Sequence, residues 1–365
     1  MKIAIVFDDC MRLGGVERVI NNLADYFSDQ FNYTIEVTNY NMNSRKQNFI
    51  YNSEVKITDL TIKNTKKDFI SKFINKIKMR KKLKKHLEKN KYDIILCMAA
   101  LSNILVAQVR KGIDAKVIGT EHVPSVGHSL KTTIKSSIFY KNLDALVVLT
   151  QEDYDKNAKY FKNVSIIYNS IPDTFKYENY NVESKKILAA GRLTEGKGFD
   201  ILIKCTREAF EKYPDWNLEI LGEGEKKKEL GSLIEKYNLS KNITIKNFID
   251  NMEEVMKEYS FFVMTSKYEG FGLVLVEAQA TGLPVISFDC KSGPKEIINN
   301  NIDGVLVNAE NENAMSSAIV RLIEDKEFRK KLSKNAVINS ERFRNEKIGN
   351  EWKELFEKMI KKKSV

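Results

Sequence analysis

Two acidic residues and a glycine turn mark the stretch 267–289, which reads KYEGFGLVLVEAQATGLPVISFD. Glu269 precedes a Gly-Phe-Gly turn, and Glu277 follows eight residues later inside an apolar run that is typical of a helix. A carboxylate among apolar neighbours must find a partner or face a cleft, because an unpaired buried charge is costly. Two such acceptors beside the N–H groups of a helix start suit a ligand with many hydroxyls, such as a sugar joined to a ribose. The spacing fits equally well a Glu269 that caps the helix and a Glu277 on its surface.

Two cations bracket a second glycine turn, in residues 191–200 (GRLTEGKGFD). The turn follows a strand-like run and precedes a helical one, so Arg192 and Lys197 are expected beside a helix start. This pair suits a diphosphate, because arginine binds two phosphate oxygens as a fork and lysine adds a point charge. Solvated surface cations are the alternative interpretation. A third junction, 221–230 (LGEGEKKKEL), has glycines that reverse the chain, and we assign it no catalytic role.

Two positions in the first half of the chain have related chemistry. Gly15 ends the loop of residues 8–18 (DDCMRLGGVER) just before an amphipathic helix, where N–H groups attract anions. A plain tight turn is the alternative. His122 ends the run KVIGTEH, and an unperturbed imidazole exchanges a proton near neutral pH. A structural role for this loop histidine is the alternative.

These loops connect short apolar runs, which are typical of strands, with segments whose apolar residues recur at helical spacing. Such a pattern is typical of parallel sheets covered by helices, in which ligands bind where strands end and helices begin. The expected strands are 2–7, 34–38, 93–98, 116–119 and 145–149 in the first half, and 186–190, 216–221, 243–245, 261–264 and 284–288 in the second. The first helix of the second half is expected at 200–211. We therefore expect an α/β protein with two doubly wound domains that join near residues 169–175.

The size and composition agree with two packed domains. The chain has 365 residues, of which 42% are hydrophobic, and this exceeds what one ordinary core needs. Its four cysteines lie far apart, without a CxxC pair or a neighbouring histidine, so we expect free thiols in a reducing cytoplasm rather than disulfides or zinc ligands. No apolar run reaches the length of a signal peptide or a membrane-spanning helix, so a cytoplasmic protein, in solution or on a membrane surface, is expected.

The formal net charge of +11 is concentrated in one segment. Residues 63–91 contain thirteen Lys or Arg and two acids, so the rest of the chain is formally neutral. Residues 68–90 predict a helix with one apolar side, formed by Phe69, Ile70, Phe73, Ile74, Ile77, Leu83 and Leu87. Such a helix suits an anionic lipid surface, and a core-facing helix with a solvated lysine face is the alternative. A nucleic-acid-binding protein is a more remote class, because the segment lacks the interleaved aromatic residues of a stacking platform.

The order of the motifs resembles glycosyltransferase family 4, whose members are retaining enzymes with the GT-B fold. The matching pieces are, in order, GGVER, GTEHVPS, YNSIP, GRLTEGKG, LGEGE, EGFGLVLVEAQATGLPVISFD and DGVLV. The resemblance implies two Rossmann-like domains that face each other across a cleft. Residues 1–172 would form the acceptor-binding domain, together with a C-terminal helix at 346–365 that crosses back to it, and residues 173–345 would bind the nucleotide sugar. The apolar face of that helix is formed by Trp352, Leu355, Phe356 and Met359.

The resemblance also implies roles for single residues around the donor. Arg192 and Lys197 would bind its diphosphate, and Glu277 would hold its ribose hydroxyls. Glu269 would lie beside the donor sugar in a positioning and electrostatic role, and His122 would lie near the same sugar. The other implied contacts are the backbone N–H groups of Gly270, Phe271, Gly272 and Leu273 with sugar and phosphate, Gly15 over the diphosphate, and the loop Asn247, Phe248 and Ile249 beside the base.

The implied reaction moves a hexose or N-acetylhexosamine from a nucleotide sugar, with UDP as the expected carrier, to a glycan acceptor linked to a polyprenyl diphosphate. The family retains the anomeric configuration by front-face attack, so no covalent enzyme nucleophile is needed. No Asp-x-Asp pair sits at a strand end, and Asp8 and Asp9 belong to the other domain from Arg192 and Lys197. Fixed cations and helix-start N–H groups would then do the work of a metal, and neither a metal nor a cofactor is expected.

Two further expectations concern partners and alternatives. The basic helix at 68–90 is expected to place the enzyme on the inner face of the cell membrane, where a polysaccharide or glycoconjugate is built, and no nucleic acid partner is expected. A nucleotide-sugar epimerase of the same fold is the alternative enzyme, although the acid pair with its Gly-Phe-Gly turn favours transfer.

Overall fold

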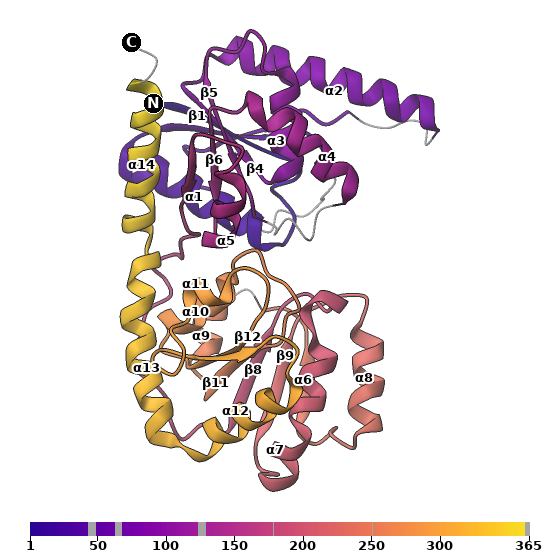
Figure 1. Cartoon of the computed structure of the whole chain (residues 1–365), viewed down its shortest axis with the longest axis vertical. Coiled ribbons are helices and arrows are strands. Elements are labelled where there is room, and N and C mark those ends of the chain that lie inside the picture. Colours follow the sequence, from indigo (N-terminus) through magenta and orange to yellow (C-terminus); the bar gives the residue numbers. More distant parts are fainter. Residues whose placement is uncertain (43–48, 63–67, 123–128, 178, 250, 362–365) are drawn as a thin grey trace. The chain divides into compact units, whose positions relative to one another are not determined.

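The computed structural model describes residues 1–42, 49–62, 68–122, 129–177, 179–249 and 251–361, and it divides the chain into two compact units (Figure 1). Unit 1 comprises Met1–Ser170 and Asn345–Val365, and unit 2 comprises Ile171–Arg344. The sequence-based boundaries, after residue 172 and before residue 346, each lie within two residues of these positions. The part of the GTEHVPS motif after His122, and the last four residues of the expected C-terminal helix, lie outside the described residues.

Unit 1 is built on a seven-stranded sheet in the order β3-β2-β1-β4-β5-β6-β7. All of its strand pairs are parallel; Ile5 of β1, for example, lies opposite Val37 on β2 and Leu96 on β4. The strands are β1 (Lys2–Phe7), β2 (Thr34–Asn39), β3 (Lys56–Asp59), β4 (Ile94–Met98), β5 (Lys116–Thr120), β6 (Ala145–Val148) and β7 (Val164–Ile166). The order and the parallel pairing confirm the predicted doubly wound sheet.

Helices connect these strands and cover the sheet. They are α1 (Gly15–Phe31), α2 (Phe69–Asn90), α3 (Ala100–Val109), α4 (Leu130–Phe139), α5 (Gln151–Asn157) and the short 3₁₀ turn η2 (Tyr140–Asn142). Helix α3 contacts both α2 and α4, so these three are neighbours on the sheet. Helix α1 buries one stripe, which includes Ile20, Leu23 and Phe27, because its apolar residues recur at helical spacing.

The C-terminal helix α14 (Asn345–Lys361) belongs to unit 1, as the resemblance implied. It contacts α1, and its residues Trp352, Leu355, Phe356 and Met359 are all buried. The ring centroids of Phe356 and Phe27 are 5.5 Å apart in an edge-to-face arrangement, which is a favourable geometry for aromatic pairs. Asn22 of α1 also exchanges hydrogen bonds with Asn345 through both side-chain amides and donates to Ser170 Oγ.

Unit 2 repeats the same plan with six parallel strands in the order β10-β9-β8-β11-β12-β13. The strands are β8 (Lys186–Ala190), β9 (Asn217–Leu221), β10 (Ile243–Lys246), β11 (Phe261–Met264), β12 (Val285–Asp289) and β13 (Val305–Asn308). The helices are α6 (Phe199–Cys205), α7 (Arg207–Lys212), α8 (Lys227–Lys236), α9 (Met252–Met256), α10 (Leu273–Ala280), α11 (Pro294–Ile297), α12 (Glu312–Glu324) and α13 (Lys326–Ser340), with 3₁₀ turns η3 (Glu195–Lys197) and η4 (Glu341–Phe343). An apolar core lies between the sheet and helices such as α6 and α12.

The structure differs from the predicted elements in two respects. The helix expected at 200–211 is interrupted at Thr206, which separates α6 from α7. The Thr206 hydroxyl donates to the backbone oxygen of Ile203, and such side-chain bonds compete with the regular bonds of a helix. Strands β3, β7 and β13 were not expected. They lie at sheet edges, where strands are only partly buried, and β3 and β7 also lack a continuous apolar run.

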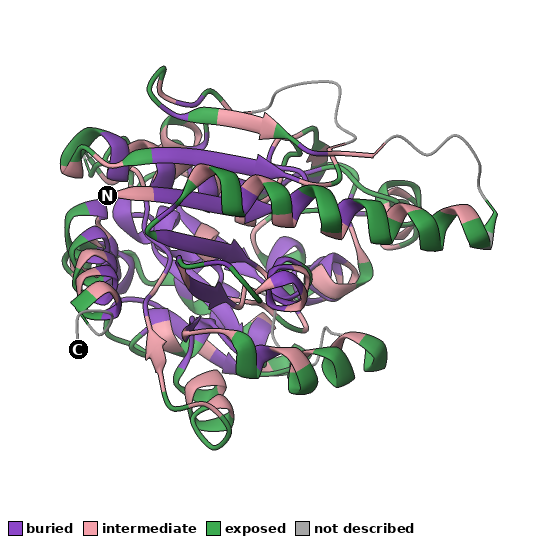
Figure 2. Cartoon of the chain, turned by 90° about the horizontal axis from the view of Figure 1, so that it is seen from above, coloured by how far each residue is buried: buried purple, intermediate pink, exposed green. Residues whose placement is uncertain are grey.

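Helix α2 has two halves with different environments (Figure 2). In the second half, Met79, Leu83 and Leu87 are buried in the core of unit 1. His86 anchors this half, because its Nε2 lies 3.1 Å from Oε1 of the buried Glu36 on β2. The first half is exposed, including the apolar side chains of Ile70, Phe73, Ile74 and Ile77. The predicted single apolar side therefore splits: the core-facing interpretation holds for Leu83 and Leu87 only. The side chain of Phe69 lies outside the described residues.

Among the described residues, no helix is both long enough and apolar enough to span a bilayer.

Candidate active site

The loops that contain most of the predicted site residues follow neighbouring strands of unit 2. Strand β8 lies in the middle of the sheet, between β9 and β11. Strands β9 and β10 follow on one side of β8, and β11, β12 and β13 follow on the other, so the strand order reverses next to β8. In open parallel sheets, ligands bind at the carboxyl ends of the strands at such a switch point. Residues 191–198, after β8, and residues 265–272, after β11, lie at this place.

An ion pair joins the two loops. Lys197 Nζ lies 2.5 Å from Glu269 Oε1, and Ser266 Oγ donates to the same oxygen at 2.6 Å. The pair is sheltered, since 26% of the Lys197 side chain and 11% of the Glu269 side chain are exposed. The structure thus brings together two residues that the sequence placed 72 positions apart.

Two site residues were missed by the sequence reasoning: Thr265 and Ser266, both buried directly after β11. Thr265 Oγ1 donates to Gly198 O at 2.9 Å, which ties the loop after β11 to the loop after β8. Gly198 has φ 63°, and a Cβ there would lie 2.2 Å from Thr265 O, so only glycine fits this approach. The signal was available as a pair of small polar residues between the apolar run FFVM and the glycine turn.

The structure decides between the two interpretations of the acids. Helix α10 begins at Leu273 with Gly272 as its N-cap and without a side-chain cap, so Glu269 does not cap it. Glu277 is 3% exposed, so it is not a surface residue. Both alternatives left open by the spacing are therefore wrong.

The start of α10 supplies backbone donors at the same place. The first N–H groups of a helix have no intrahelical acceptor and carry the positive end of its dipole. Here the turn is formed by Gly270, Phe271 and Gly272, and the helix begins with Leu273. Phe271 is 3% exposed, and its ring packs edge to face on Phe343 at 5.6 Å, which fixes the turn.

Arg192 and the loop of residues 247–249 lie at the margins of this site. Arg192 is exposed, and its guanidinium makes no hydrogen bond or ion pair with any residue that the structure describes, so it is available to a ligand. The segment Asn247–Ile249 follows β10, two strands away from β8. Lys227 at the start of α8 donates to Asn247 Oδ1 at 2.8 Å, and this contact joins the loop to α8.

The glycines of the third junction are structural, as the sequence suggested. A Cβ on Gly222 would lie 1.9 Å from Gly191 O. The glycine therefore lets the loop after β9 pack directly on the loop that leads to Arg192 and Lys197.

The cysteine near the pair is not a nucleophile. Burial raises the pKa of the Cys290 thiol to about 12; the charge of Glu269 adds to this shift and that of Lys197 opposes it. The thiol is therefore protonated at neutral pH, and thiols in this form are unreactive. All four cysteines are free and buried, which confirms the prediction of unpaired thiols.

In unit 1, Gly15 lies at an open helix start. It is exposed at the first position of α1, and a Cβ there would contact nothing within 4 Å. The preceding loop is held by Arg12, which lies 2.8 Å from Asp8 Oδ1 and 3.2 Å from Glu17 Oε1. Burial raises the pKa of Glu17, which the nearby Arg12 partly offsets.

His122 follows β5 in unit 1 and is more buried at its ring nitrogens than expected. Neither nitrogen has a hydrogen-bond partner among the described residues, and both are shielded from solvent. Burial lowers the pKa of His122 to about 4, so the ring is neutral at pH 7. The proton exchange near neutral pH that an unperturbed imidazole would offer is therefore not available to His122 in this structure.

A buried polar network that the sequence did not reveal fixes the backbone before His122. Asn103 of α3 accepts from Thr120 N at 3.2 Å and donates to Thr120 O at 2.9 Å. It also donates to Tyr140 Oη at 3.0 Å, and the Tyr140 hydroxyl donates to Glu121. Burial raises the pKa of Glu121 to about 8, which the hydrogen bond from Tyr140 partly offsets.

Across the described part of the chain, no group of three or more His, Cys, Asp or Glu side chains is arranged to hold a metal ion. Asp8 is paired with Arg12, and Asp9 Oδ1 accepts from Met11 N at 3.1 Å.

Comparison with known proteins agrees with this architecture. Residues 170–337 match the family model for glycosyl transferases group 1, and residues 13–175 match the model for glycosyltransferase family 4. The amylovoran biosynthesis glycosyltransferase AmsD of Erwinia amylovora is 29% identical over 369 residues, which cover 97% of this chain and 99% of that protein.

A second relative and a solved structure extend the comparison. The Campylobacter jejuni N-acetylgalactosamine-N,N'-diacetylbacillosaminyl-diphospho-undecaprenol 4-alpha-N-acetylgalactosaminyltransferase is 31% identical over 229 residues, 60% of this chain and 62% of that protein. HepE of Anabaena, solved in complex with UDP and glucose, has the same fold, with a TM-score of 0.80 and 18% identity over 98% of this chain and 100% of that one. With family matches that together span residues 13–337 and two doubly wound parallel sheets, the chain is a glycosyltransferase of family 4 with the GT-B fold.

Proposed function

We propose that the protein transfers a hexose or N-acetylhexosamine, with retention of anomeric configuration, from a UDP-sugar to a lipid-linked glycan. The observation that carries the donor part of this proposal is the Lys197–Glu269 pair at the switch point of unit 2, beside the start of α10. A relative named for amylovoran biosynthesis, a relative named for a diphospho-undecaprenol substrate and a UDP-bound structural neighbour support the choice of donor and acceptor class.

In this proposal the ion pair opens when the donor binds. Lys197 exchanges the Glu269 carboxylate for a diphosphate oxygen, and the exposed Arg192 adds a fork of N–H donors. Glu269, released from Lys197 but still bonded to Ser266, then accepts hydrogen bonds from the donor sugar. Glu277 holds the ribose hydroxyls, residues 270–273 donate backbone N–H groups, and residues 247–249 lie beside the base.

The leaving diphosphate gains negative charge when the sugar–phosphate bond breaks. Lys197, Arg192 and the dipole of α10 provide fixed positive charge where this develops, which lowers the barrier without reorganisation of the protein. We propose that transfer proceeds without a metal ion, so it persists in excess EDTA. The attacking hydroxyl approaches the same face and gives its proton to the departing phosphate oxygen, so the anomeric centre keeps its configuration.

Unit 1 is assigned to the acceptor. Gly15, at the open start of α1, is proposed to meet the donor diphosphate, and His122 the donor sugar. Because burial keeps His122 neutral at pH 7, we assign it a hydrogen bond to a sugar hydroxyl and not a proton transfer. The exposed first half of α2, within the segment 68–90, is proposed to bind the inner face of the cell membrane, where a polyprenyl-diphosphate acceptor resides.

A panel of nucleotide sugars tests the donor assignment. The wild-type protein is expected to gain thermal stability with UDP-sugars and with UDP, and Lys197→Ala is expected to lose this gain. The matched control is Lys186→Ala: Lys186 pairs with Glu258 at 3.1 Å at the opposite end of the same strand, away from the site. No stabilisation of the wild type by any nucleotide sugar, or equal loss in the control, would contradict the proposal.

Product analysis tests the reaction. Radiolabelled sugar is expected to appear on a lipid-linked acceptor, with an anomeric coupling constant that matches the donor. An isomerised nucleotide sugar, formed without acceptor, would instead identify an epimerase.

A further inference from the structure

We propose that helix α4 is a second membrane-binding element, which inserts its exposed apolar stripe into an anionic lipid surface together with the first half of α2. The stripe consists of Leu130, Ile134 and Ile138, here called the α4 stripe. The inference rests on the proposed membrane-linked function, but it concerns a different helix from the one that the sequence singled out.

The α4 stripe lies on the outward side of its helix. The side chains of the α4 stripe recur every four residues, so they share one face, and they are 76%, 51% and 48% exposed. Thr132 and Ser136, on the opposite face, are less exposed, and no residue of α4 is buried. A helix on the surface of a soluble protein normally turns its apolar stripe inward. Helix α4 turns Thr132, Ser136 and, at its end, the core-packed Phe139 toward the protein, and it presents the branched side chains of the α4 stripe outward.

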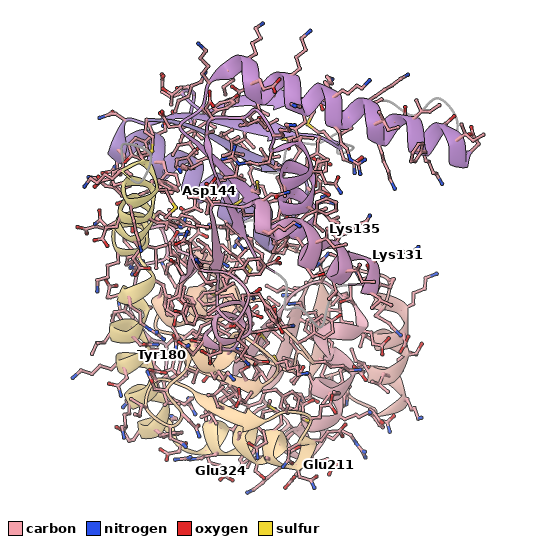
Figure 3. The ribbon with its side chains drawn as sticks, turned by 45° about the horizontal axis from the view of Figure 1, so that its top comes forward. Lys131, Lys135, Asp144, Tyr180, Glu211 and Glu324 are labelled. Atoms are coloured by element: carbon pink, nitrogen blue, oxygen red, sulfur yellow. The ribbon has the colours of Figure 1, made fainter. Side chains whose placement is uncertain are left out.

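The charges around the stripe favour an anionic surface. Lys131 and Lys135 each follow a member of the stripe, and the segment 129–139 contains no acidic residue. Both lysines are exposed and extend from α4 into open space (Figure 3). Such side chains lie along apolar surface while their ammonium groups reach lipid phosphates.

Exposed apolar side chains also lie near the starts of the two other helices on this side of unit 1. Helix α3 lies between α2 and α4 and contacts both, and the N-terminal ends of α2 and α4 project to the same side of unit 1 (Figures 1 and 2). On α2, Ile70 is 70% and Phe73 is 58% exposed, and Leu101 at the start of α3 is 62% exposed. Three adjacent helices therefore expose apolar side chains at their first turns. Isolated exposed apolar residues are common, but a gathered set of this kind marks an interaction site.

A second copy of the chain fits this surface poorly. In a two-fold dimer the same patch meets itself, so Lys131 and Lys135 of one copy would approach the lysines of the other. An anionic bilayer supplies both the apolar interior and the opposite charge. It would contact unit 1 where the helices follow the carboxyl ends of β4 and β5, which is the edge at which a ligand of this sheet binds.

Vesicle binding by matched variants tests the proposal. The wild-type protein is expected to co-sediment with vesicles of phosphatidylglycerol and phosphatidylcholine at low salt, and not with phosphatidylcholine alone. Leu130→Ser/Ile134→Ser is expected to weaken this binding at least tenfold, while UDP-sugar still stabilises the variant against heat. The control is Ile302→Ser/Ile338→Ser in unit 2, at side chains that are 55% and 65% exposed, and it is expected to bind like the wild type.

A fluorescent label locates the contact. All four native cysteines are buried, so an environment-sensitive dye attaches selectively to Ile134→Cys. Its emission is expected to shift to the blue on addition of phosphatidylglycerol vesicles, whereas a dye on Ile338→Cys is not expected to shift.

The remaining outcomes separate the role of α4 from the roles of α2 and of a second copy of the chain. Wild-type binding that Phe73→Ser/Ile74→Ser abolishes and Leu130→Ser/Ile134→Ser leaves unchanged overturns the role of α4 but keeps that of α2. A wild type that binds no anionic vesicle overturns membrane docking through both helices, while transfer to an acceptor in detergent would still support the proposed reaction. A lipid-free dimer that the α4 double variant dissociates would assign the stripe to a second copy and overturn the proposal.

Discussion

At the scale of single residues, Glu269 illustrates how a carboxylate is kept ready in a sheltered position. Lys197 and Ser266 both contact Oε1, so the charge is compensated before any ligand is present. In the proposed function, a donor diphosphate competes for the lysine, and the hydroxyl of Ser266 remains with the acid. In that proposal Lys197 exchanges one anionic partner for another, while the hydroxyls of Ser266 and of the donor sugar hydrogen-bond the Glu269 carboxylate.

Substitutions at the pair separate binding from transfer. Lys197→Ala is expected to weaken UDP binding at least tenfold and to lower kcat/KM by about 10²–10³, as for the loss of one charge-stabilising donor. Glu269→Gln removes the competitor of the diphosphate, so UDP is expected to bind at least as tightly as in the wild type while kcat falls. Calorimetry with UDP and initial-rate kinetics measure both effects. Tighter binding in Lys197→Ala, or weaker binding in Glu269→Gln, would contradict the exchange of partners.

The raised pKa of Glu121 predicts that the free energy of unfolding falls as the pH rises. Burial raises its folded pKa to about 8, whereas an unfolded glutamate has a pKa of about 4.3. Between these values the unfolded state loses the proton and the folded state keeps it, so the free energy of unfolding falls by up to about 1.4 kcal/mol per pH unit.

Glu121→Gln is expected to remove this decline, because an amide oxygen accepts from Tyr140 and Asn103 without ionising. Thermal unfolding at pH 5 and pH 8 measures the difference between variant and wild type. The variant's advantage should grow with pH, and an equal shift at both values would assign a purely structural role to the side chain.

At the scale of elements, the close approach of two loops depends on one glycine. Gly198 has φ 63° and lies against Thr265 O. Gly198→Ala is expected to cost about 1–3 kcal/mol and to displace Lys197, which lowers donor affinity as well as stability. Gly231→Ala is the control, because a Cβ there meets nothing within 4 Å and α8 should gain about 0.5–1 kcal/mol. Chemical denaturation and UDP titration compare the two variants, and equal stabilities would refute the argument.

The elements show where sequence reasoning succeeds. The runs at residues 3–7 and 261–264 are apolar throughout, so strands were predicted there. Both strands are buried, as is typical of a parallel sheet with helices on both faces. Edge strands such as β3 lack that signal. Periodicity alone placed one apolar side along 68–90, but it did not reveal that Ile70 projects beyond the core while Leu83 lies within it.

Some residues of the candidate site could be found from the sequence, and others could not. Glu269 and Lys197 were found because charged residues beside glycine turns are conspicuous in a sequence. Ser266 and Asn103 were not, since a buried hydroxyl or amide gains its meaning from neighbours distant along the chain. The pKa of His122 also depends on burial that no local pattern records.

At the scale of the whole molecule, α14 makes unit 1 discontinuous along the chain. Phe356→Ala is expected to destabilise unit 1 by about 3–5 kcal/mol, because it opens a cavity beside Phe27 and Trp352. Hydrogen exchange should therefore accelerate in β1 and α1 and remain unchanged in β8 and α6. Tyr160→Ala is the control in the same unit, at a side chain that is 79% exposed. Equal acceleration in both units would show that they unfold as one.

The discontinuity of unit 1 also affects the order in which the two units can fold during translation. Unit 2 has all its residues once position 344 has been translated, but unit 1 waits for the turn of helix that ends at Lys361. While residues 171–344 are being synthesised, the surface of α1 around Phe27 lacks its contact with α14. The segment made first is thus finished last, which inverts the usual order of domain completion from the N-terminus.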